Sequence, residues 1–329
     1  MSDTKKINWM SVLQGWSMLL VVIGHVDLNN QSMDSMHPIA NLIKSIIYGF
    51  HMPLFMFISG YLFYLTRISK DRTYISVIKD KFKRLYIPML FFTLVAFVPK
   101  ILLAPLMNHP AHLTLQYFFN VFLLYKENPL AEMWFVISLL EIMLLFPLYK
   151  WADNNLGKEL GLLLLFVVLG DFTITCDYFQ LLHVVYMLPF FYGGALMCKY
   201  NLSKYIEGKW GLAISLSLFI TVNVLGSKSP SQVINLIGII FSFSLCLNIS
   251  KLFPSLFSSF RNYTYQIFLM GIFFQMMIRY LYSASELLSN FYWLLFLLST
   301  FVGVFIPVFL SKIVKHFDSS WLNICFGLK

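Results

Sequence analysis

The 329-residue sequence has few charged side chains and no segment that is polar throughout. Only 12% of its residues are Asp, Glu, Lys or Arg, whereas an average soluble domain has about 25%. Hydrophobic residues make up 59% of the chain, and its mean hydropathy is +0.73. These proportions exclude a disordered chain, a collagen-like repeat and an ordinary soluble enzyme. They indicate a polytopic membrane protein.

Cysteine is also scarce, and the four cysteines have no CxxC pair and no spacing typical of metal ligands. They are Cys176, Cys198, Cys246 and Cys325. Three of them lie in or beside apolar segments, where cysteine behaves as a small hydrophobic residue. We therefore expect neither a disulfide framework nor a metal site.

Long apolar runs dominate the chain, and about 20 apolar residues suffice for one helix to cross a bilayer. We predict an all-α fold, a polytopic transmembrane helix bundle of about ten spans that forms one domain over residues 1–329. The predicted spans are 10–28, 44–65, 86–106, 130–150, 158–176, 181–198, 209–226, 232–250, 262–282 and 290–314. A shorter apolar stretch, Leu113–Tyr125, has the length of a re-entrant or interfacial helix.

The positions of Lys and Arg predict the orientation of these spans. The net charge is +9, which in a soluble protein would suggest a nucleic-acid partner. With both termini in the cytoplasm, however, all but five of the 24 Lys and Arg residues fall in cytoplasmic segments. The five exceptions are Lys44, Lys100, Lys126, Lys228 and Arg279. Because cytoplasmic loops collect these residues, the charge indicates membrane orientation, and we expect no nucleic acid among the partners.

Two histidines stand at the ends of the first two predicted spans. His25 ends the first apolar run, and His51 opens the second span on the same, outer side of the membrane. Ionisable groups inside a bilayer are costly, so each one marks a candidate site, and the two would share one vestibule. The alternative is a hydrogen-bonded histidine near the interface for His25, or one at the aromatic belt for His51. The residues alone leave this choice open.

Later segments add charged candidates. Arg84 follows the most basic loop and lies one turn before Pro88, where it either holds an anion or anchors the loop at the cytoplasmic face. Glu132, Trp134 and Glu141 share one apolar run, and Glu141 lies deep enough to need a partner.

The Ser59-Gly60 step favours close helix packing over a nucleophile, because no nucleophile elbow surrounds it.

Several of these segments, in this order, are similar to the motifs of acyltransferase family 3 membrane proteins, and the fucose 4-O-acetylase-like branch is the most similar. The segments are Val21–His25, Phe50–Phe55 with Ser59–Tyr61, Lys83–Pro88 and Trp134–Phe135. The resemblance covers nearly the whole chain and includes the number of spans.

The resemblance implies transfer of an acyl group, usually acetyl, from cytoplasmic acyl-CoA to a hydroxyl of an extracytoplasmic polysaccharide or lipid-linked glycan. It implies a multi-pass protein of the bacterial plasma (inner) membrane, in contact with membrane lipids. Acetyl-CoA or another acyl-CoA would be a co-substrate, with no tightly bound cofactor. The oligomeric state stays open.

The resemblance also suggests roles for individual residues. The histidine that matches His25 is taken as essential in such proteins, and we interpret it as the general base. Asp27, two residues further along, would point away from the same helical face, so we expect Glu132 or a residue not yet identified as its partner. We assign the binding of the donor to Arg84, Lys83 and Gln14. We assign the binding of the acceptor to His51, Ser59, Tyr61, Trp134 and Glu141.

The sequence departs from the family pattern at three polar positions. Gln14 and Ser11 stand where members usually carry a basic residue and Asp, and Gly271 ends a late helix where the family often has His. Two other functions therefore stay open. One is an exporter of a glycan or lipid-linked sugar, and the other is a non-catalytic scaffold of a polysaccharide assembly complex.

Overall fold

The computed structural model describes residues 3–28, 37–70, 72–102, 114, 116, 120, 128–172, 180–225, 231–284 and 286–328. Every regular element in these ranges is a helix, which confirms the all-α prediction. Contacts between residues divide the chain into two compact units. Unit 1 comprises Met1–Ile58 and Tyr200–Phe317, and unit 2 comprises Ser59–Lys199 and Asp318–Lys329. That residues 1–329 act as one domain stays a prediction.

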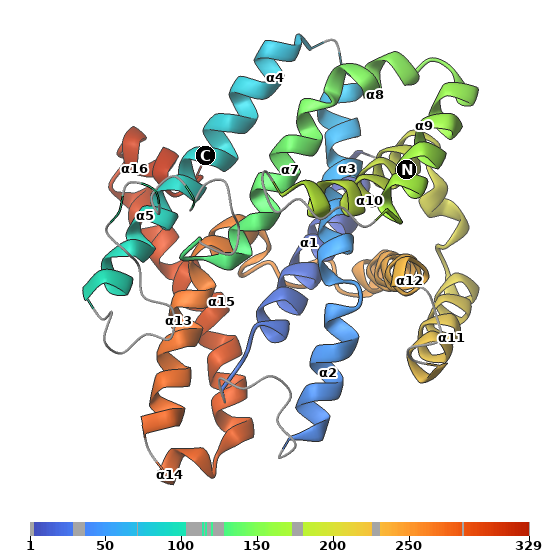
Figure 1. Ribbon diagram of the computed structural model, residues 1–329. Helices are drawn as coiled ribbons and strands as arrows, with labels where there is room; N and C mark the ends of the chain where they lie inside the picture. Colours follow the sequence, from blue (N-terminus) through green and yellow to red (C-terminus); the bar gives the residue numbers. More distant parts are fainter. Residues whose placement is uncertain are drawn as a thin grey trace. The chain divides into compact units, whose positions relative to one another are not determined.

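Figure 1 labels most of these helices along the chain. Unit 1 contains α1 (Asp3–Gly24), α2 (Pro38–Tyr48), the start of α3 (His51–Phe63), η6 (Leu202–Tyr205), α11 (Lys209–Leu225), α12 (Ser231–Leu252), η8 (Arg261–Tyr263), α13 (Thr264–Ala284), α14 (Glu286–Ser289) and α15 (Tyr292–His316). Unit 2 contains the end of α3, η1 (Tyr64–Ile68), α4 (Tyr74–Lys81), η2 (Phe82–Tyr86), α5 (Ile87–Leu102), η5 (Ala131–Met133), α7 (Trp134–Leu144), α8 (Phe146–Ala152), α9 (Leu156–Gly170), α10 (Leu181–Lys199) and α16 (Ser320–Cys325).

Several helical segments are long and apolar enough to cross a membrane. Within the described residues they are Pro38–Ile68, Leu181–Lys199, Ser231–Leu252, Arg261–Ala284 and Tyr292–His316, and the pair Ala131–Leu144 and Phe146–Ala152, bent by 48°, would make a sixth. Each overlaps a predicted span, which confirms a helical membrane protein. The count of ten spans and the cytoplasmic termini stay predictions. Most of the predicted short helix at 113–125 lies outside the described residues.

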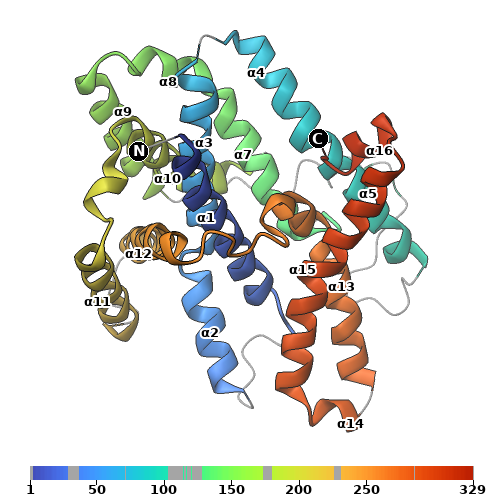
Figure 2. The same cartoon turned by 180° about the vertical axis from the view of Figure 1, so that it is seen from behind.

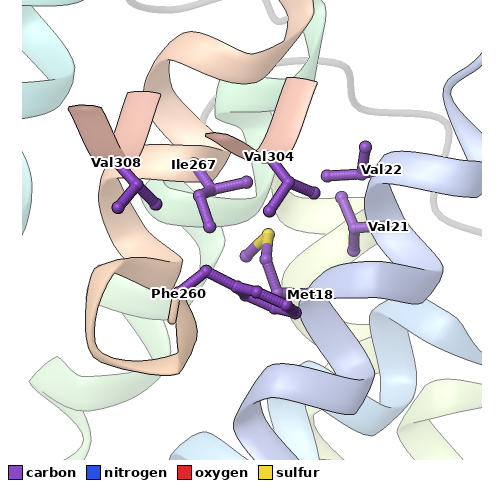
Figure 3. Close-up of a cluster of buried hydrophobic side chains, with 7 residues drawn as sticks. All are labelled: Met18, Val21, Val22, Phe260, Ile267, Val304 and Val308. Atoms are coloured by element: carbon purple, nitrogen blue, oxygen red, sulfur yellow. The ribbon is translucent and has the colours of Figure 1, made fainter. Parts of the chain in front are cut away.

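Apolar side chains of α1, α13 and α15, with one residue from just before η8, form a core in unit 1. Helices α13 and α15 lie side by side, and α1 contacts both (Figures 1 and 2). Figure 3 shows the side chains that meet there, which are Met18, Val21, Val22, Phe260, Ile267, Val304 and Val308. This packing fixes the last turns of α1, which lead directly to His25.

Unit 2 is held together by aromatic packing and by one very close helix contact. Tyr149 is fully buried beside Phe191 and Tyr192, and its hydroxyl donates a hydrogen bond to the Ile142 carbonyl at 2.9 Å. A Cβ atom on Gly60 would overlap the Phe191 carbonyl, so α3 and α10 approach each other backbone to backbone. This is the packing role that the Ser59-Gly60 step predicts.

A small group of charges fixes the end of α10. The Lys199 ammonium group donates hydrogen bonds to Asp153 Oδ1 at 2.9 Å and to Glu159 Oε1 at 2.5 Å. Glu159 is almost completely buried, so its charge has a partner where an unpaired carboxylate would be costly.

Candidate active site

His25 lies in the turn that follows α1, and a hydrogen bond fixes its ring. Its Nδ1 atom is 2.8 Å from the carbonyl oxygen of Val21, one helical turn earlier. A carbonyl oxygen can only accept, so Nδ1 carries the hydrogen, and in a neutral ring the lone pair is then on Nε2. The half-buried side chain makes no ion pair within the described residues. His25 therefore has the tautomer and the free nitrogen that a general base needs.

His51 is the first residue of α3 and repeats this arrangement. Its Nδ1 atom is 2.9 Å from the carbonyl oxygen of Ile47, so its lone pair is also on Nε2. The residue is only 2% exposed, and Nε2 has no hydrogen-bond partner among the residues that the structure describes. A buried acceptor without a partner costs about 1–3 kcal/mol. This nitrogen therefore marks a place for a ligand or a water molecule.

The structure brings the two predicted histidines together. Their ring centres are 5.9 Å apart and their planes meet at 78°. The ring of Tyr48 contacts both, with its centre 4.9 Å from that of His51 and 5.8 Å from that of His25. Tyr48 was not predicted from the sequence, although its position three residues before His51 is the spacing of neighbours on a helical surface.

Close packing between α1 and α2 holds the histidines in contact. A Cβ atom on Gly24 would lie 3.1 Å from Cγ2 of Ile47, whose carbonyl orients His51. Because Gly24 has no side chain, α1, which leads to His25, can approach α2, whose residue Ile47 orients His51.

A buried glutamine supports the same end of α1. Nε2 of Gln275 in α13 donates a hydrogen bond of 2.8 Å to the carbonyl oxygen of Val22. This carbonyl follows the one that orients His25, so Gln275 fixes the backbone from which the histidine extends. The sequence gives no signal for this contact beyond a polar residue in an apolar span.

The glycine at the late-helix position of α13 has a packing role in this chain. A Cβ atom on Gly271 would lie 2.9 Å from the carbonyl oxygen of Gly303 in α15. A histidine side chain does not fit at this contact without moving α15. At the position where the family often has histidine, this chain therefore has a glycine that allows close packing of α13 and α15.

Asp27, the carboxylate nearest to His25 in sequence, is paired with two cations. Its Oδ1 atom is 3.3 Å from the Lys44 ammonium group, and its Oδ2 atom is 3.6 Å from the Arg279 guanidinium group. Both cations belong to the five that the predicted topology places outside. Asp27 neutralises part of their charge and is not the partner of His25.

A basic groove lies in unit 2, beside α4 and η2. It has a volume of about 520 Å³ and is lined by Arg67, Arg72, Ser76, Val77, Asp80, Lys83, Arg84, Ile324 and Leu328. Asp80 forms an ion pair with Arg67 and lies 3.9 Å from Arg84. Four basic side chains thus face one carboxylate, and this excess of donors suits a phosphate-bearing ligand. Arg84 and Lys83, which were predicted to bind the acyl donor, lie in this groove. Arg67 and Arg72 were not predicted to contribute to it.

Two further predicted residues lie in different units. They are Gln14, assigned to the binding of the acyl donor, and Glu132, assigned as the partner of the general base. Gln14 is half-buried in α1 of unit 1, and Glu132 is half-buried in η5 of unit 2. The partnership of Glu132 with His25 stays a prediction.

The other residues assigned to binding of the acyl acceptor all lie in unit 2. Ser59 is half-buried, and Tyr61 is buried and hydrogen-bonded to Cys198. The ring of Trp134 packs on His183 with 4.3 Å between the ring centres. Oε2 of Glu141 is buried and has no hydrogen-bond partner in the described residues. Their assignment to acceptor binding stays a prediction.

In the described residues, no group of three or more His, Cys, Asp or Glu side chains could hold a metal ion.

A family model described as an acyltransferase domain, that of acyltransferase family 3, matches residues 7–312. No curated protein and no solved structure matches the chain.

Proposed function

The chain belongs to acyltransferase family 3, and on this basis we propose that it is a membrane O-acyltransferase that uses acetyl-CoA and acts on a hydroxyl of a glycan. The observation that carries the proposal is the contact of His25 Nδ1 with the Val21 carbonyl oxygen. Its Nδ1–H is held by the Val21 carbonyl, which leaves Nε2 as a free base. We place the protein in a bacterial inner membrane, with a polysaccharide or lipid-linked glycan as acceptor.

The chemistry follows from this free nitrogen. Nε2 of His25 removes the proton from the acceptor hydroxyl while the hydroxyl oxygen attacks the thioester carbonyl carbon of acetyl-CoA. The carbon–sulfur bond then breaks, and the CoA thiolate takes the proton from the imidazolium. The products are the acetyl ester and free CoA. A positioned general base of this kind contributes about 10²–10⁴ in rate.

The basic groove is the proposed binding site for the phosphates of CoA. Arg84 and Lys83 are both exposed there, and Lys83 makes no ion pair within the described residues. Guanidinium groups bind phosphate oxygens in pairs of hydrogen bonds, and lysine adds a compact charge. The groove would thus hold the nucleotide end of the donor.

Two measurements test the proposal. Surface glycans from cells with and without the gene are compared by mass spectrometry, and the loss of the gene should remove the mass of one acetyl group from the glycan. The purified full-length protein should also transfer radiolabelled acetyl from acetyl-CoA to that glycan, and His25→Gln should not. An exporter or a scaffold would leave the purified protein without transfer activity, which would contradict the proposal.

A further inference from the structure

We propose that His51 accepts a hydrogen bond from a second hydroxyl of the acceptor, so that the site selects sugars whose reacting hydroxyl has a free neighbour. This inference rests on the proposed function, because it concerns the acceptor bound at His25. Three features support it: the tautomer of each ring, the buried nitrogen of His51, and the distance between the rings.

The tautomers make both nitrogens acceptors. In each histidine the Nδ1–H donates to a backbone carbonyl, Val21 for His25 and Ile47 for His51, so both Nε2 atoms carry lone pairs. Two acceptors cannot bond to each other, and a ligand that satisfies both must bring two donors. One hydroxyl group has a single hydrogen. Two neighbouring hydroxyls of a sugar supply one donor for each ring.

The burial of His51 leaves its Nε2 atom in need of a hydrogen-bond donor. Nε2 is buried and has no hydrogen-bond partner in the described part of the chain, and the residue is only 2% exposed. Buried acceptors are almost always satisfied by protein, ligand or ordered water. A ligand hydroxyl would remove the cost of this unpaired atom.

The distance between the rings fits a pair of adjacent hydroxyls. The ring centres are 5.9 Å apart, so one sugar ring can lie within reach of both Nε2 atoms. Each nitrogen would accept a hydrogen bond of about 2.8 Å from one of two neighbouring hydroxyl oxygens. Only His25 removes a proton, whereas the second hydroxyl keeps its proton while it donates to His51.

The test compares matched acceptors on matched variants. Methyl glycosides of common hexoses are acetylated by the full-length protein with acetyl-CoA, and the acetylated position is identified. The best acceptor is then compared with monodeoxy analogues that lack a hydroxyl next to that position. For the wild type, loss of the neighbouring hydroxyl should lower kcat/KM by about 5- to 100-fold, because His51 is left unpaired.

Two substitutions of His51 separate the two ring nitrogens. Asn places an amide N–H near Nδ1 and nothing at Nε2, so His51→Asn should keep the hydrogen bond to Ile47. Its kcat/KM should be the same for the parent sugar and for the monodeoxy analogue. Gln reaches the position of Nε2 with an amide oxygen, so His51→Gln should retain discrimination between them. Thermal stability of each variant checks that the fold is intact.

The outcomes distinguish this inference from the proposed function. If the wild type transfers acetyl but accepts the monodeoxy analogues as well as the parent sugar, the inference is wrong while the proposed function stands. If His51→Asn lowers kcat/KM, relative to the wild type, by the same factor for the parent sugar and for its monodeoxy analogue, then His51 acts through water or structure. That result also overturns the inference. If no acceptor is acetylated, neither on the panel nor from the native glycan, the proposed function itself fails.

Discussion

Replacing Arg84 by alanine should weaken the binding of CoA by about tenfold. A hydrogen bond to a charged group contributes about 1.5–3 kcal/mol. The lower value applies here, because the Arg84 side chain is 43% exposed and its guanidinium lies 3.9 Å from Asp80, which competes for it. A loss of about 1.4 kcal/mol is a tenfold change in a dissociation constant. The Kd for CoA, measured on the purified protein by calorimetry, checks this value directly.

Lys79 provides a matched control on the same stretch of helix. It is exposed, as Arg84 is, but it lines a neighbouring apolar groove with Ile75 and Phe82 and does not line the basic groove. The Lys79→Ala variant should therefore bind CoA nearly as the wild type does. Binding by the wild type should also weaken as salt is added, and the Arg84→Ala variant should respond less, because screening acts on the contact that it has lost.

Two results would refute the reasoning. Equal, small effects of Arg84→Ala and Lys79→Ala would mean that these side chains serve membrane anchoring at a cytoplasmic face. An unchanged Kd in Arg84→Ala with an intact fold would remove the groove from donor binding altogether.

Other substitutions test other parts of the structure. Asp80→Asn removes the carboxylate that competes for two arginines of the groove, so the Kd for CoA should fall, and a rise would show that Asp80 positions these arginines. His25→Gln should lower kcat by about 10²–10⁴ at nearly unchanged thermal stability, and retained activity would make this histidine structural. Gln275→Leu leaves the buried Val22 carbonyl unpaired and should lower the free energy of unfolding by about 1–3 kcal/mol and reduce kcat, whereas wild-type values would exclude a supporting role. Gly60→Val forces α3 away from the backbone of α10, so little folded protein should be recovered from membranes, and a normal yield with normal stability would contradict the close packing.

The sequence predicts the helices well, because about 20 consecutive apolar residues in lipid leave the backbone few alternatives to a helix. Each of the ten predicted ranges contains at least part of a helix within the described residues, such as α12 for 232–250 and α13 for 262–282. Bounds are predicted less well, because the apolar pattern does not show where a helix bends. Phe146 begins a new helix after a bend of 48° inside the predicted span 130–150.

The site is only partly predictable from the sequence. His25 and His51 are visible as costly polar residues in apolar runs. Their supports are not visible, because Gln275 reaches Val22 from a helix that follows hundreds of residues later. The ion pair of Arg67 with Asp80 is equally hidden, since it joins two segments across a loop. Only the spacing of Asp80 and Arg84, four residues apart on one helical face, could have suggested part of the groove.

The charges around His25 constrain how the proposed reaction handles its proton. Asp27 is engaged by Lys44 and Arg279, and His25 makes no ion pair within the described residues of either unit. In the triad of a serine hydrolase, a buried aspartate stabilises the imidazolium that forms during attack. The described residues place no carboxylate beside His25 in this role. A direct transfer of this proton to the departing CoA thiolate removes both charges in one step, so we expect the breakdown of the thioester to be tightly coupled to proton transfer from His25.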